Sequence, residues 1–134
     1  MTPTTFHHLR ETLGLPVAFA AGSLGVARRT LTRWEQGHTP LPENAGTWMR
    51  QWCDLTEAHI AWAIEEARPQ LCVHSSEARY HLGHDAKSSY LTSSWWNRCA
   101  GRVAAVTGAE LVQDLCLVKI QAPALVAPAC EAVE

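Results

Sequence analysis

The sequence predicts a mainly α-helical protein with a small N-terminal helical domain, a long helix and a small C-terminal α+β region. Two short helical segments meet at Gly25, and an apolar stripe with helical spacing runs through residues 43–67. The run 70–74 is typical of a strand, and the run 115–120 of a strand or the last buried turn of a helix. We place the boundary between residues 1–44 and residues 45–134, just before the stripe becomes aromatic.

Residues 17–24 are expected to form the first short helix. Pro16 precedes them, and a proline at a helix start gives up only an N–H that would have no partner there. Gly25 follows the last turn, where a left-handed glycine commonly ends a helix. A second helix is expected to begin near Ala27 and to end at Gly37.

The second short helix has one apolar and one polar face. Leu31 and Trp34 lie three residues apart and form the face that we expect to be buried. The other face carries Arg28, Arg29, Thr32 and Arg33. Arginines at the start of such a helix can enter the major groove of DNA and bond bidentately to guanine. Taken alone, the same residues are equally typical of a helix face that is merely solvated.

The stretch from Leu9 to Pro42 resembles the Cro/CI-type helix-turn-helix of the XRE-like family. The helix pair, the glycine turn and the ending Trp34-Glu35-Gln36-Gly37 occur together at fixed spacing. The family usually has a small polar capping residue where this chain has Ala27, which cannot cap the free N–H groups. The resemblance implies a structural ion pair between Arg10 and Glu35. It also implies a DNA-contacting set made of Arg28, Arg29, Thr32, Arg33, His38 and Thr39.

Composition allows this function and favours a cytoplasmic location. The net charge is −2, but residues 1–43 carry four arginines against three glutamates, and residues 44–134 carry seven basic and ten acidic groups. A local basic patch suffices for groove binding, although sequence-independent affinity for DNA should be modest. The five cysteines do not have the pattern of a disulfide framework. No apolar run is long enough for a membrane helix, and no basic-then-apolar leader opens the chain.

Residues 43–67 are expected to form one long helix with an aromatic face. Trp48, Trp52, Leu55, His59 and Trp62 recur at steps of four and three residues. Core packing is the simplest role for these tryptophans. The stripe still needs a partner surface, which either the C-terminal half or a second subunit supplies. A small domain does not readily cover so much aromatic surface, so we expect a second subunit to cover part of it.

Another helix is expected from Trp95 to Thr107, with Ser93 or Ser94 as its cap and Gly108 at its end. Small residues at positions 100, 104 and 108 recur every four residues and permit the close approach of another helix. These observations predict a homodimer. Its interface residues are expected to be Trp48, Trp52, Trp62, Trp95, Ala100 and Ala104.

The overall layout resembles the YdiL-like proteins and the anti-CRISPR-associated repressors, in which the C-terminal half forms a homodimer. The tryptophan-led segment 95–105 is part of that resemblance. It implies an autoregulatory repressor of a bacterium or phage that binds an inverted repeat in double-stranded DNA. An antitoxin that binds both operator DNA and a toxin is the alternative, and binding of RNA in addition is left open.

A third possibility is a ligand- or metal-sensing regulator, suggested by Cys72, His74, His81 and His84. Their spacing differs from the tighter pairs of zinc sites, so we expect surface and interface histidines, and no metal or other cofactor. No nucleophile with its base, phosphate-binding glycine loop or carboxylate pair stands out, and an enzyme is therefore not expected.

Overall fold

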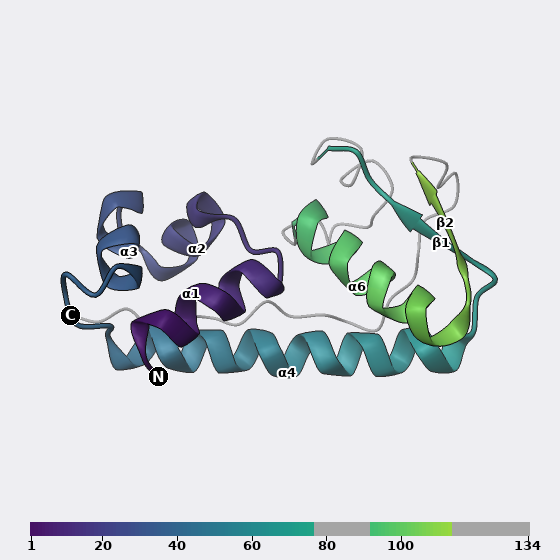
Figure 1. Ribbon diagram of the computed structural model, residues 1–134, viewed down its shortest axis with the longest axis horizontal. Helices are drawn as coiled ribbons and strands as arrows, with labels where there is room; N and C mark the ends of the chain where they lie inside the picture. Colours follow the sequence, from purple (N-terminus) through teal and green to yellow (C-terminus); the bar gives the residue numbers. More distant parts are fainter. Residues whose placement is uncertain (77–91, 114–134) are drawn as a thin grey trace. The chain divides into compact units, whose positions relative to one another are not determined.

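The computed structural model describes residues 1–76 and 92–113, and this part of the chain is mainly helical with one small sheet (Figure 1). The coarse fold class predicted from the sequence is thereby confirmed. No helix in the described ranges is long and apolar enough to cross a membrane. The elements in chain order are α1 (Pro3–Thr12), α2 (Val17–Leu24), α3 (Arg28–Glu35), α4 (Glu43–Glu66), β1 (Gln70–Val73), α6 (Ser93–Thr107) and β2 (Glu110–Gln113).

The chain divides into two compact units within α4, between Asp54 and Leu55. Among the described residues, the first unit contains 1–54 and the second contains 55–76 and 92–113. The sequence suggested a boundary before residue 45. The division lies further along because Trp48 and Trp52 of α4 pack with the aromatic residues of α1 and α2.

Local sequence signals set the helix ends of the first unit. Thr2 caps α1, because its Oγ1 accepts a hydrogen bond of 3.1 Å from the N–H of Thr5. Gly25 ends α2 with φ of 68°, the left-handed conformation that glycine adopts without a steric penalty. The N–H of Val26 then bonds to the carbonyl of Ala21 at 3.0 Å, which closes the turn before α3.

The core of the first unit is aromatic. The rings of Phe6 and Trp48 have centroids 6.3 Å apart, and those of Trp48 and Trp52 are 6.2 Å apart. Phe19 of α2 meets Trp52 edge-on, with a centroid separation of 5.6 Å and an interplanar angle of 81°. Leu31 and Trp34 of α3 are buried in the same unit, as the apolar spacing predicted.

The second unit contains a parallel two-stranded sheet and helix α6. Strands β1 and β2 pair with Gln70 opposite Glu110 and Val73 opposite Gln113. β1 lies within the predicted strand, whereas β2 was not predicted, and the predicted element at 115–120 lies outside the described residues. Thr92 caps α6 by accepting a 3.2 Å bond from the N–H of Trp95. The prediction that Ser93 or Ser94 is the cap was wrong, because both lie inside the helix.

The aromatic part of the expected dimer interface requires correction. Trp48, Trp52 and Trp95 have relative exposures of 1%, 0% and 0% within the single chain. Ala100 is also buried, while Trp62 and Ala104 are half-buried. The expectation that a second subunit covers Trp48, Trp52 and Trp95 was therefore wrong. Each buried ring is covered by its own unit, where Phe6 and Phe19 meet the first two and His59 meets the third.

Candidate nucleic-acid interface

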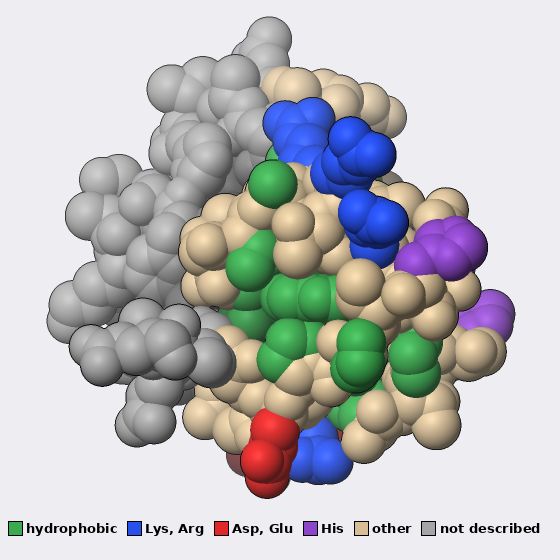
Figure 2. Space-filling model, turned by 90° about the vertical axis from the view of Figure 1, so that its left-hand side faces the viewer, with side chains coloured by type: hydrophobic (Ala, Val, Ile, Leu, Met, Phe, Trp, Pro, Cys, Tyr) green, Lys and Arg blue, Asp and Glu red, His purple; other side chains and the backbone are tan. Residues whose placement is uncertain are grey.

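Helix α3 separates an apolar face from a basic face. Leu31 is fully buried and Trp34 nearly so, whereas Arg28, Arg29 and Arg33 are exposed. Within the described ranges, none of these three arginines takes part in an ion pair. Arginine side chains gather on the face of the first unit that carries α3, with histidines beside them (Figure 2). The exposed side of α3 is thus a basic surface on a helix whose opposite side is anchored.

The N-terminus of α3 adds to this positive surface. Ala27 occupies the cap position with φ of −71° and ψ of 150°, and it provides no side-chain hydrogen bond. The first N–H groups of a helix without such a cap are left for other acceptors, and the helix dipole favours negative charge there. An anion near Arg28 and Arg29 would therefore meet N–H donors as well as guanidinium groups.

The polar residues around the arginines are less available than the sequence suggested. Thr32 is half-buried, and its hydroxyl donates to the carbonyl of Arg28 at 3.0 Å. Thr39 is half-buried, and its Oγ1 is enclosed without a hydrogen-bond partner among the described residues. His38 is exposed. Arg28, Arg29, Arg33 and His38 are consequently the side chains that can reach a ligand without rearrangement.

Arg10 and Glu35 form the ion pair that the family resemblance implied. Arg10 Nε lies 2.5 Å from Glu35 Oε1, and Arg10 Nη2 lies 3.2 Å from Oε2. The side chains are only 8% and 7% exposed. Arg10 Nη1 also donates to the carbonyl of Leu15 at 3.0 Å. The guanidinium therefore ties α3 both to α1 and to the segment that leads into α2.

His7 completes this cluster, and it was missed in the sequence. Its Nδ1 lies 3.0 Å from Glu35 Oε2, and its Nε2 lies 3.6 Å from Glu11 Oε1. The available signal was the three-residue spacing of His7 and Arg10, which places both on one face of α1. Burial acts to raise the pKa of Glu35, but the hydrogen bonds and charges of Arg10 and His7 outweigh it and leave that pKa lowered. The Glu35 carboxylate at the end of α3 therefore stays ionised.

Only two of the four residues considered as metal ligands lie in the described part of the chain. Cys72 and His74 are buried in the second unit, while His81 and His84 lie outside the described residues. Both backbone groups of His74 are hydrogen-bonded to Asn97. The N–H donates to Asn97 Oδ1 and the carbonyl accepts from Asn97 Nδ2, each at 2.8 Å. Residues 1–76 and 92–113 contain no group of three or more His, Cys, Asp or Glu that could hold a metal ion.

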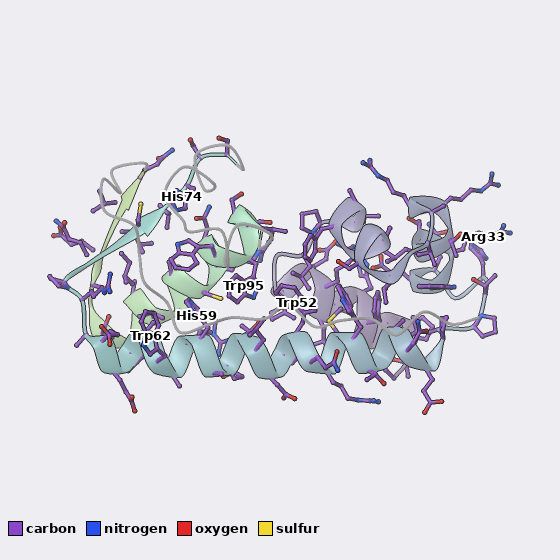
Figure 3. The ribbon with its side chains drawn as sticks, turned by 180° about the vertical axis from the view of Figure 1, so that it is seen from behind. Arg33, Trp52, His59, Trp62, His74 and Trp95 are labelled. Carbon is purple, nitrogen blue, oxygen red and sulfur yellow. The ribbon has the colours of Figure 1, made fainter. Side chains whose placement is uncertain are left out.

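No protein-family profile matches the chain, and no curated protein matches it either. The function must therefore be argued from α3 and its surroundings. Arg33 projects from the end of this helix in the side-chain view (Figure 3).

Proposed function

We propose that this protein is a homodimeric, sequence-specific DNA-binding repressor of the Cro/CI type, in which α2, the turn at Gly25 and α3 form the helix-turn-helix. One observation carries the proposal. Arg28, Arg29 and Arg33 are exposed together on a helix whose other face is buried and whose last residue, Glu35, is ion-paired to α1. A helix whose arginines were only solvated would not require a buried face and a buried ion pair to fix its position.

In the proposed mechanism, α3 enters the major groove and its arginines bond to guanine O6 and N7. The Arg10–Glu35 pair fixes the position of α3 relative to α1, so the backbone that carries the α3 arginines is held in one place. A recognition helix held in this way needs less rearrangement on binding, which favours discrimination between bases. The uncapped start of α3 provides N–H groups for a phosphate of the same groove.

The operator is proposed to be an inverted repeat read by two copies of α3. A two-fold symmetric dimer places its recognition helices about 34 Å apart, one turn of B-DNA, on one face of the duplex. The bound dimer would occlude a promoter, and a repressor of this kind commonly controls its own. The family resemblance supports this regulatory role.

The proposal is tested by selecting bound sequences from a pool of randomised duplexes. We expect enrichment of a repeat whose half-sites contain guanines. A triple variant with Arg28, Arg29 and Arg33 changed to Ala should lose binding to the selected duplex. The matched control is Arg50→Ala, which removes an exposed arginine from α4 of the same unit. Failure to enrich any sequence, or equal losses in the triple variant and the control, would contradict the proposal.

A further inference from the structure

The outer edge of β1 is closed by side chains of α6. In the parallel ladder, the N–H of Glu110 donates to the carbonyl of Pro69. Because backbone groups alternate along a strand, those of residues 71 and 73 also face β2. The backbone groups of residues 70, 72 and 74 face the other edge. On that edge the indole of Trp96 donates to the carbonyl of Cys72 at 2.9 Å. Asn97 then bonds to both backbone groups of His74. Another strand could not bind there without displacing α6.

The outer edge of β2 has the opposite character. Backbone groups alternate in direction along a strand, so those of Glu110 and Val112 both point toward β1. The N–H and carbonyl groups of Leu111 and Gln113 therefore point away from β1. No strand among the described residues pairs with this edge. Leu111 is 48% exposed, and its strand carries neither proline nor lysine, the residues that commonly protect an exposed edge. β2 is therefore a hydrogen-bonding edge with an apolar side chain at its centre.

We infer that β2 pairs antiparallel with β2 of a second copy of this chain, about a two-fold axis at Leu111. The choice of a second copy rests on the proposed function, because an inverted repeat requires a two-fold symmetric reader. A symmetric interface uses one patch twice, and β2 is self-complementary in this register. The two Leu111 residues exchange their backbone bonds, and each Glu110 lies opposite a Val112.

The side chains of the strand favour this register over the adjacent one. A two-fold axis at Val112 would place the exposed, apolar Leu111 opposite the polar Gln113. An axis at Leu111 avoids this and joins the two exposed leucines across the interface. The result is a continuous four-stranded sheet in the order β1-β2-β2-β1, with α6 side chains closing both outer edges.

Sedimentation of the full chain across micromolar concentrations tests the interface. Wild-type protein should be a dimer. Leu111→Lys and Leu111→Glu should each raise the dimer dissociation constant at least tenfold, because like charges then face each other. An equimolar mixture of the two variants should dimerise again, since Lys would face Glu only in the proposed register. Val106→Lys is the matched control, because Val106 is 68% exposed but lies in α6. It should leave dimerisation unchanged.

Amide hydrogen exchange of the wild-type chain is a second test. It needs no substitution, so it remains informative if a variant fails to fold. The N–H of Leu111 should become protected as protein concentration rises, while the N–H of Val112 should be protected at all concentrations by its bond to β1. A monomeric wild-type chain would overturn the inference. So would a Leu111 amide whose exchange is independent of concentration, or dimers that separate with Val106→Lys but persist with Leu111→Lys.

The interface and the DNA-binding function can fail separately. If the dimer forms through β2 but no duplex sequence is enriched, the interface stands and the proposed function is overturned. If a monomeric wild-type chain binds a single half-site, DNA binding stands and the interface is overturned. Leu111→Lys should retain the wild-type affinity for an isolated half-site and lose affinity for the complete repeat.

Discussion

Arg10 of α1 and Glu35 of α3 hold each other through two hydrogen bonds in a setting where both side chains are more than nine-tenths buried. A buried ion pair contributes little net stability compared with an apolar pair, but removal of one partner leaves an uncompensated charge. The pair therefore acts mainly to fix how α3 sits on α1, and α3 carries the proposed recognition surface.

Glu35→Ala should destabilise the protein by about 3–5 kcal/mol, because Arg10 would remain buried and keep only the exposed Glu11 carboxylate, 3.7 Å from its Nη2. Denaturant unfolding followed by tryptophan fluorescence measures the change. The matched control is Glu57→Ala, which breaks the Arg102–Glu57 pair of 2.9 Å, whose side chains are 51% and 65% exposed. This exposed pair should contribute about 1 kcal/mol or less. Equal losses in the two variants would show that the Arg10–Glu35 pair is not buried in solution.

His59 should make the second unit sensitive to acid. It lies near the rings of Trp62 and Trp95 (Figure 3) and near that of Trp96, and the three centroids are 5.8, 5.2 and 5.1 Å away. Burial lowers its pKa to about 4 from 6.5, so the folded state holds the neutral ring while the unfolded chain takes up a proton first. Stability is therefore expected to fall as pH drops from 6.5 toward 4, by up to about 3 kcal/mol in total.

The His59→Phe variant tests this origin of the acid sensitivity. It keeps an aromatic ring in the site and removes the titrating group, so the free energy of unfolding should change less between pH 7 and pH 4 than in the wild-type protein. His8→Asn is the control, because His8 is exposed on α1. An unchanged pH profile in His59→Phe would show that other groups cause the acid sensitivity.

The backbone at Ala67 offers a stabilising substitution. Ala67 follows α4 with φ of 48°, a left-handed conformation that disfavours any residue with a Cβ atom. Ala67→Gly should raise the stability by about 1 kcal/mol, since the left-handed penalty exceeds the extra entropy that glycine loses. Gly25→Ala is the reverse case, because Gly25 has φ of 68° and no atom within 4 Å of an added Cβ. It should destabilise by about 1–2 kcal/mol for conformational reasons alone. Thermal unfolding of both variants checks the prediction, and shifts of the same sign would contradict it.

Local signals in the sequence predicted some elements well. Gly25 and the spacing of Leu31 and Trp34 identified α2, α3 and the buried face of α3, because one glycine and one helical period determine them. The cap of α6 was harder to assign, since Thr92, Ser93 and Ser94 can all act as caps and only the structure shows which hydroxyl meets the N–H of Trp95.

Long-range features were not accessible in the same way. The aromatic stripe of α4 shows which face is apolar, but not whether the same chain or a second copy covers it. Trp48 and Trp52 are covered by their own unit. Strand β2 has only four residues and depends on pairing with β1, a strand distant in sequence. His7 was overlooked because its partner Glu35 lies on a different helix.

If α3 reads DNA as proposed, single substitutions will separate base contacts from phosphate contacts. If an arginine bonds to guanine, its replacement with alanine should weaken operator binding by about 1–3 kcal/mol and relax the preference at one base position. Replacing one that binds phosphate should weaken all sequences alike and reduce the salt dependence by about one ion. Arg28→Ala, Arg29→Ala and Arg33→Ala are therefore compared on the selected operator and on duplexes with one changed base, at several salt concentrations. Arg50→Ala should match the wild-type protein in each measurement. Three variants that keep wild-type affinity and base preference would remove α3 from the interface.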